Sequence, residues 1–442
     1  MWGTDRPAAA GSAASELGSN RPEPTTFVQG TGRGLSRPRA PVSVRTVGSP
    51  FWRVWFGESV SGLGDAAFAV AFSWVVLSTT GSPEVLAGTL VAGAVPRGLL
   101  LLLGGAVVDR VSARTVLLAA HLVRGFSVGG LAAAVVAGDP GLTSFIAAAV
   151  AVGAADAFAG PASLALLPVL VPADRLSRAN ALVSVSEQVA FVAGPLCAGA
   201  LVATAGPAPA LVADAATFGL AAVTVLAAPA VRAVSERPLL AEIGAGLRWA
   251  YRTAEVRAVL LVVAAATLSY AGLFGVGLPA LARNSGGALG LGVLVSAWGV
   301  GQLVGSIAAG ITGLPARWGR LVGLMSVAEA ATFVTIGVTT EVAVAAALLA
   351  LLGVGVAYSQ DVALPTWLQT RTPPERLGRT SSLLQLARTA LEPVSLAGIG
   401  LFAAVDVRLA FAVAAVPVLA AGLWLLGSPA TRALGVRPEP AS

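Results

Sequence analysis

From Phe51 onward, the chain alternates long apolar segments with short polar breaks. Each apolar segment has roughly 20–28 residues, which is enough for an α-helix to cross the roughly 30 Å of hydrocarbon in a bilayer. The pattern therefore predicts an all-α polytopic membrane protein with twelve transmembrane helices. The expected helices cover residues 51–77, 84–108, 114–137, 142–170, 179–203, 208–229, 256–282, 288–313, 320–339, 342–369, 380–403 and 408–427.

The composition agrees with this pattern and excludes a soluble protein. Hydrophobic residues make up 56% of the 442 residues and charged residues 11%. Soluble domains have roughly 25% charged residues, so a water-soluble surface cannot be built from this chain. The net charge of +6 is therefore interpreted as basic loops beside anionic lipid, and no nucleic-acid partner is expected.

The arginines predict the orientation in the membrane. All 28 basic residues are arginine. Seven precede or enter the first helix, sixteen lie in the loops and tail of the same face, and the opposite face has only Arg283 and Arg408. Since positive residues are enriched in cytoplasmic loops, both termini are expected in the cytoplasm, with the chain in the cell (plasma or inner) membrane.

The least apolar segments predict the domain organisation. Residues 1–48 are expected to form a disordered basic cytoplasmic tail, with a regulatory or lipid-contacting role as the alternative. Two six-helix halves follow, over residues 49–229 and 256–428. Residues 230–255 mix Leu, Ile and Trp with charges and are expected to form an interfacial amphipathic helix in a cytoplasmic linker. Residues 429–442 are a second cytoplasmic tail.

Several chemistries are excluded by missing residues. One cysteine excludes an internal disulfide, and one histidine leaves no His/Cys cluster for zinc. A P-loop needs a lysine, and none is present, so an ATP-driven pump on this chain is excluded. HExxH does not occur, and an intramembrane hydrolase is disfavoured. No metal, cofactor or enzymatic activity is expected.

Two internal matches indicate that the halves are repeats. Residues 104–114 match 310–320, because in both a glycine at the end of a helix precedes an arginine-bearing loop. Residues 172–178 match 373–379 with four identities in seven positions. Parallel repeats of this kind predict two pseudo-symmetric halves of six helices each.

The segment 104–114 resembles the signature of the loop between helices two and three in the major facilitator superfamily. Gly104, Asp109, Arg110 and Arg114 stand at matching positions, whereas Ser112 replaces a usual glycine. Asp109 is expected just past a helix end, where a carboxylate can cap a helix or pair with arginine. The resemblance implies a cytoplasmic gate between the halves, and the alternative is a plain topology-setting loop.

Other segments resemble the drug/proton antiporter branch of this superfamily, which includes macrolide efflux proteins and the enterobactin exporter. These are residues 57–65, 160–180 and 369–379. Gly194, Pro195 and Gly199 resemble the antiporter motif GPxxGG of helix five, with Ala198 replacing one glycine, and in the family this motif accompanies export. Pro195 removes a backbone hydrogen bond and the glycines allow close helix approach. The alternative is an ordinary kinked transmembrane helix.

Charged residues inside the predicted spans are the candidates for transport chemistry, because each is costly in hydrocarbon. Eight acids face three bases, so not all of them can form one-to-one ion pairs. Some of the acids are therefore expected to be protonated, as a proton carrier requires. The acids are Glu58, Asp65, Asp156, Glu187, Asp214, Glu329, Asp361 and Glu392, and the bases are Arg97, Arg124 and Arg388. The proton-coupling candidates are Asp65, Asp156, Glu187 and Asp361.

Asp65 is the first choice among these because it lies near the middle of the first span. Phe68 and Phe72 follow at i+3 and i+7 on the same helix face, which suits an amphiphilic cargo. The alternative is that Asp65 locks helices together by bonding Arg97 or Arg124. The further cavity or ion-pair candidates are Glu58, Phe68, Phe72, Arg97, Arg124 and Arg388.

The leading hypothesis is a secondary transporter that exports small amphiphilic molecules by proton antiport with alternating access. The expected partners are a small-molecule cargo, protons and the lipid bilayer, and the energy source is the proton gradient. A monomer is expected. Drugs, macrolides, siderophores and secondary metabolites all remain open as cargo. The alternatives are an uptake or lipid-flipping transporter of the same fold and a non-transporting membrane sensor.

Overall fold

The computed structural model describes residues 49–138, 140–230, 254–313, 318–362, 364–366 and 374–428. The predicted tails and amphipathic linker helix lie outside these residues, apart from a few positions at their edges. All regular structure in the described residues is helical. Twelve segments among them are long and apolar enough to cross a membrane, as the sequence pattern predicted.

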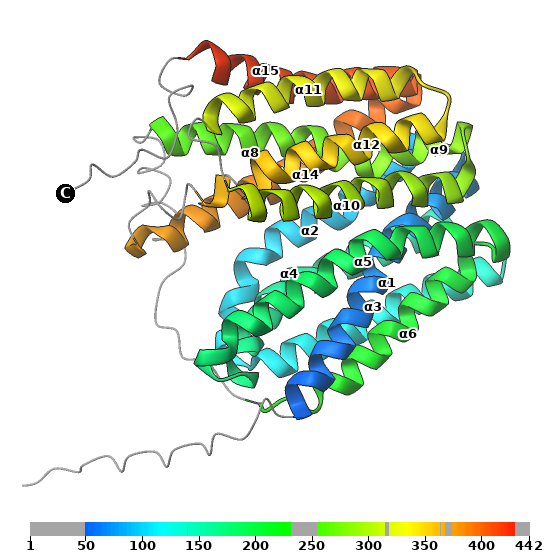
Figure 1. The fold of residues 1–442 in the computed structure, drawn as a ribbon. Coiled ribbons are helices and arrows are strands. Elements are labelled where there is room, and N and C mark those ends of the chain that lie inside the picture. Colours follow the sequence, from blue (N-terminus) through cyan, green and yellow to red (C-terminus); the bar gives the residue numbers. More distant parts are fainter. Residues whose placement is uncertain are drawn as a thin grey trace, which may run out of the picture. The chain divides into compact units, whose positions relative to one another are not determined.

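The first six spanning helices pack against one another (Figure 1). Within this group α4 packs on α2 and α3, and α1 and α3 both pack on α6. A short 3₁₀ helix precedes the fifth span, over Ala173–Arg175. The six helices are α1 (Ser49–Thr80), α2 (Pro83–Arg110), α3 (Ala113–Val136), α4 (Leu142–Leu170), α5 (Leu176–Ala205) and α6 (Pro207–Val225).

The other six spans form a second group, and two of them contain a π-helical segment. These segments, η2 and η3, fall in the seventh and tenth spans. π-Helical turns inside α-helices occur frequently at functional sites. The elements are α8 (Ala254–Gly272), η2 (Leu273–Gly277), α9 (Leu278–Asn284), α10 (Gly287–Thr312), α11 (Trp318–Val338), α12 (Val342–Val356), η3 (Ala357–Val362), α14 (Pro374–Val405) and α15 (Val407–Gly427).

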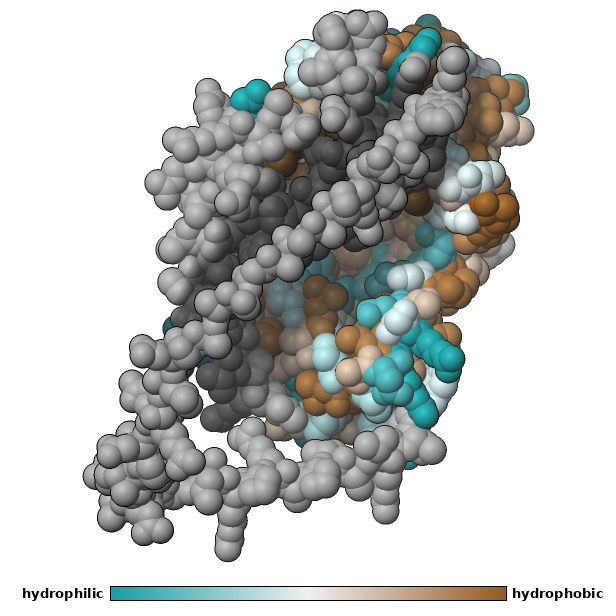
Figure 2. Space-filling view, turned by 60° about the vertical axis from the view of Figure 1, so that its left-hand side comes forward, coloured by the Kyte–Doolittle hydropathy of each residue, from teal (hydrophilic) through white to brown (hydrophobic). Residues whose placement is uncertain are grey.

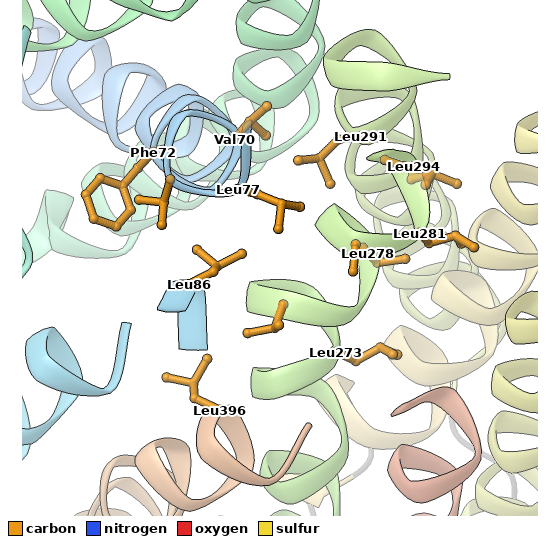
Figure 3. Packing of buried hydrophobic residues seen from close by; sticks show 14 of the residues in the cluster. Val70, Phe72, Leu77, Leu86, Leu273, Leu278, Leu281, Leu291, Leu294 and Leu396 are labelled. Atoms are coloured by element: carbon orange, nitrogen blue, oxygen red, sulfur yellow. The ribbon is translucent and has the colours of Figure 1, made fainter. Parts of the chain in front are cut away.

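The two groups meet along two helix pairs, α5 with α10 and α2 with α14. A buried hydrophobic cluster joins them near the end of the bundle where α1 ends and α2 begins, here called the α1–α2 end. Figure 3 shows side chains of α1, α2, η2, α9, α10 and α14 converging in this cluster. At the same end, Arg283 Nη1 donates a hydrogen bond to Gly81 O at 2.5 Å.

Many large apolar side chains remain on the surface, as lipid contact requires. Leu99, Phe126, Leu164 and Ile311 are each more than 70% exposed, and in water such exposure would be unfavourable. Figure 2 shows hydrophobic side chains along the right-hand flank of the described surface and hydrophilic ones gathered toward its lower end.

The loop between α2 and α3 differs from the prediction. We expected Asp109 just past a helix end, but α2 continues through Arg110 because its backbone hydrogen bonds extend to Val111 N. Asp109 is therefore in the last turn of α2, and its side chain lies outside the described part of the structure. Ser112, which replaces a usual glycine of the signature, caps α3 by accepting a hydrogen bond from Thr115 N at 3.2 Å.

Candidate functional site: a charged and aromatic cavity between the halves

A central cavity of about 700 Å³ is lined by helices of both groups. Its volume falls in the range of roughly 300–1,000 Å³ that is typical of small-molecule sites. Apolar side chains form most of the wall, and the ionisable groups come from five helices. The ionisable and aromatic residues of the wall are Glu58, Asp65, Arg97, His121, Arg124, Asp156, Glu392, Phe68, Phe72, Phe191 and Phe274.

Arg124 of α3 holds two carboxyl groups from different helices in this wall. Its Nη2 donates a hydrogen bond to Asp65 Oδ1 of α1, and its Nε lies 3.1 Å from Asp156 Oδ1 of α4. Its guanidinium carbon lies 4.2 Å from the centroid of the Phe218 ring, a cation–π distance. Because Arg124 is only 7% exposed, these carboxyl groups compensate its buried charge. Asp65, Arg124 and Asp156 are called the Arg124 cluster below.

A second polar contact lies one helical turn away on α3. His121 Nε2 is 2.7 Å from Glu58 Oε1 of α1, and Ser163 Oγ donates to the other Glu58 oxygen at 3.4 Å. His121 Nδ1 is buried without a hydrogen-bond partner among the described residues. Glu58, an ion-pair candidate from the sequence, thus contacts the histidine of α3.

Asp214 of α6 adds another carboxyl group near the Arg124 cluster, on which it acts electrostatically. The residue is 1% exposed, and its Oδ2 has no hydrogen-bond partner among the described residues. Its Oδ1 accepts a long hydrogen bond of 3.4 Å from Thr217 Oγ1. A Cβ atom at Gly64 would collide with this carboxyl group, so the glycine makes room for it. The first half therefore holds more acids than bases around Arg124.

The aromatic part of the wall adjoins the Arg124 cluster. The rings of Phe68 and Phe72 have centroids 5.0 Å apart, and both residues line the cavity. Their contact with cargo stays a prediction. Phe72 is nearly buried and also packs edge-on against Phe145. Phe191 and Phe274 extend the aromatic wall toward the second half.

Arg97 of α2 connects the two groups of helices. Its Nη2 lies 2.6 Å from Glu392 Oε2 of α14. The sequence left open whether Arg97 attracts an anionic cargo group or neutralises a carboxylate, and in this conformation it pairs with Glu392. The pair lines the central cavity and is partly exposed, so its energetic contribution is small.

A second cavity of about 820 Å³, the C-terminal cavity, lies mainly among helices of the second half. Asp361 of η3 lines it and accepts a hydrogen bond from Gln302 Nε2 at 3.0 Å. Arg388 also lines this cavity and acts electrostatically on Asp361. Asp361 is therefore separate from the Arg124 cluster, although Phe191, Ala271, Phe274 and Glu392 line both cavities.

Glu187 occupies a third position. It lines a lateral cavity of about 450 Å³ between α1, α4 and α5. This cavity shares Glu58, Asp65 and Arg124 with the central cavity. The structure thus brings Asp65 and Asp156 together, places Glu187 in an adjoining space and leaves Asp361 in the other half.

The helix-five motif lies where α5 packs closely on α1 and α10. A Cβ atom at Gly194 would lie 2.7 Å from Ala66 Cβ of α1, and one at Gly199 would lie 2.6 Å from Ala288 O of α10. Pro195 is inside α5, and its carbonyl oxygen abuts Gly292 of α10. Of the gate motif, Gly104 packs α2 against the backbone of α4, and Arg110 is exposed.

Sequence reasoning did not place Glu329, Gln360 and Tyr270. Glu329 of α11 is fully buried and accepts a hydrogen bond from Gln360 Nε2 of η3, and the Tyr270 ring of α8 packs on Trp298 and Phe333. A carboxyl group in the middle of an apolar span was the available signal. Gln360 and Tyr270 lie 31 and 59 residues from Glu329 in the chain, so no pattern within one helix shows that they are close to it.

The fold and these cavities define a polytopic membrane protein built as two six-helix groups around a central cavity, the architecture of major facilitator transporters. Residues 38–432 match the model of the transmembrane secretion effector family. The chain belongs to this family of the superfamily, as its sequence motifs predicted.

Two relatives are efflux transporters. The chain is 26% identical over 408 residues to the multidrug efflux pump Tap of Mycolicibacterium fortuitum, covering 88% of this chain and 98% of that protein. It is 29% identical over 336 residues to the enterobactin exporter EntS of Shigella boydii serotype 18, covering 74% of this chain and 78% of the exporter.

Solved structures agree on the fold. A bacterial homologue of the iron transporter ferroportin in an inward-facing state superposes with a TM-score of 0.66 at 20% identity, covering 86% of this chain and 98% of that one. The nucleoside transporter NupG gives 0.69 at 10% identity, covering 86% of this chain and 99% of the transporter.

Proposed function

We propose that the protein is a proton-coupled exporter of small amphiphilic molecules that works by alternating access. The observation that carries this proposal is the Arg124 cluster in the wall of a cavity that also has an aromatic lining. One surface then binds cargo through the phenylalanines and a proton through Asp65 or Asp156. Cargo and proton compete for this site, because protonation of Asp65 weakens its bond to Arg124 and changes the net charge of the wall.

The proposed orientation has both termini in the cytoplasm, as the arginine distribution favours. The α1–α2 end is then the outer end, where the hydrophobic cluster and the Arg283–Gly81 contact join the halves. The structure corresponds in this orientation to a state closed on the outside. Tap is named as an efflux pump and EntS as an exporter, and these relatives support export over uptake for this chain.

Expression of the protein in a drug-sensitive bacterium is expected to lower the cellular accumulation of at least one compound from a panel of macrolides, cationic dyes and siderophores. A protonophore is expected to abolish this difference, because the proton gradient is the energy source. Accumulation is compared with that in cells without the protein. The control variant Asp406→Asn is expected to lower accumulation as the wild type does. Asp406 is an exposed N-cap of α15 whose cap bond an asparagine preserves. Raised accumulation would contradict export and indicate uptake.

A further inference from the structure

The C-terminal half contains a buried carboxyl group that the mechanism above does not use. Glu329 lies in the middle of the span Gly319–Val338 and is 0% exposed. Its Oε1 accepts a hydrogen bond from Gln360 Nε2, and its Oε2 has no hydrogen-bond partner among the described residues. An ionised carboxylate in this setting is costly.

Among the described residues, no cation is found to act electrostatically on Glu329. Tyr270 of α8 and Asp361 of η3 are the ionisable groups that act on it. α12 has no ionisable residue, and α15, which packs along α11, has only Arg408 in its first turn. The buried Tyr270 hydroxyl interacts with the Glu329 carboxyl group. A proton on Glu329 removes the negative charge, and the carboxylic acid and the hydroxyl can then each donate to the other.

Two of the groups around Glu329 also line the C-terminal cavity. Gln360 and Tyr270 are part of its wall, whereas Glu329 itself is not. Gln360 belongs to the π-helical segment η3, and Tyr270 lies three residues before the other one, η2. π-Helical turns inside α-helices occur frequently at functional sites, and a local shift of the chain is expected at such a turn. Such a shift at Gln360 would open Glu329 to water in the cavity.

We propose that Glu329 is a second proton-carrying residue. It is protonated in the conformation of this structure, in which Gln360 is bonded to it, and it releases its proton to the C-terminal cavity when Gln360 moves away. This proposal rests on the proposed proton-coupled export and adds a proton site in the half opposite to the Arg124 cluster. The step is a simple ionisation: the carboxyl group gives its proton to water of the C-terminal cavity when that cavity is open to the inside, and it takes up a new proton from water when the cavity is open to the outside.

Glu329→Gln tests the proposal because the amide mimics the protonated carboxyl group and can still accept the bond from Gln360. In proteoliposomes, the variant is expected to keep exchange of labelled for unlabelled cargo but to move fewer protons per cargo. Glu341→Gln is the matched control, since Glu341 is an exposed N-cap of α12 without a side-chain cap bond. An unchanged proton-to-cargo ratio in Glu329→Gln would overturn the proposal.

A second measurement uses the wild-type protein and needs no variant to fold. Dicyclohexylcarbodiimide reacts with protonated carboxyl groups in apolar sites, and mass spectrometry locates the modified residue. Modification of Glu329 is expected at acid pH and should fall as the pH rises through the range in which transport operates. Modification that does not change with pH would overturn the proposal. Absence of proton coupling in the wild type would instead overturn the proposed function, and the labelling would still decide whether Glu329 ionises.

Discussion

Asp65→Asn is expected to lower the cargo gradient that the protein maintains by about 50-fold at a membrane potential of about 100 mV. One proton crossing this potential is worth about 2.3 kcal/mol, and each 1.36 kcal/mol corresponds to about a factor of ten. An asparagine cannot carry the proton. The variant therefore loses this energy for each uncharged cargo molecule that the wild type exports in exchange for one proton.

The variant is expected to fold, because Arg124 keeps Asp156 at 3.1 Å and the Phe218 ring at 4.2 Å. It should therefore exchange labelled for unlabelled cargo at close to the wild-type rate while losing concentrative efflux. The measurement is the accumulated gradient in energised vesicles, with Asp406→Asn as the control. A full gradient in Asp65→Asn would move coupling to Asp156 or Glu187.

Gly292→Ala is expected to destabilise the protein by about 1–3 kcal/mol, the usual cost of adding atoms to a packed site. A Cβ atom at Gly292 would collide with Pro195 O, and the Gly292 and Gly199 backbones pack directly on each other. The added methyl group must therefore push α10 away from α5, along one of the two helix pairs that join the halves. Transport is expected to fall as well, because the halves move against each other there.

Gly219→Ala is the matched control for this substitution. Gly219 is an exposed residue inside α6, and a Cβ atom there would meet nothing within 4 Å. Because alanine is favoured over glycine in a helix interior by about 1 kcal/mol, this variant should be as stable as wild type or more stable. Thermal unfolding in detergent compares the two variants. Equal stability would show that the α5–α10 contact is looser than the structure indicates.

Much of the fold could be predicted because its signal is local. An apolar run has to be long enough to span the membrane, and each predicted span corresponds to a helix in the described residues. The π-helical segments in the seventh and tenth spans were not predicted, because a wider helical turn does not change the hydrophobicity of the span. Asp109 was misplaced because the end of α2 depends on backbone bonds that extend two residues beyond the predicted end.

The site was harder to predict because its contacts join distant helices. The sequence offered both Arg97 and Arg124 as partners of Asp65, and only the rotation of the helices selects Arg124. Arg97 instead reaches Glu392, which is 295 residues away. Intramembrane charge identified the candidate residues, whereas the pairing among them required the packing of both halves.

In the proposed mechanism, outward movement of cargo is coupled to inward movement of protons. The most direct test uses purified wild-type protein in proteoliposomes without an imposed ion gradient, with a trapped pH-sensitive dye and the compound that responds most strongly in the accumulation assay. A cargo gradient is expected to move protons in the opposite direction, and Asp65→Asn should reduce this movement. Proton movement in the same direction as the cargo, or cargo transport without any proton movement, would contradict the proposed mechanism.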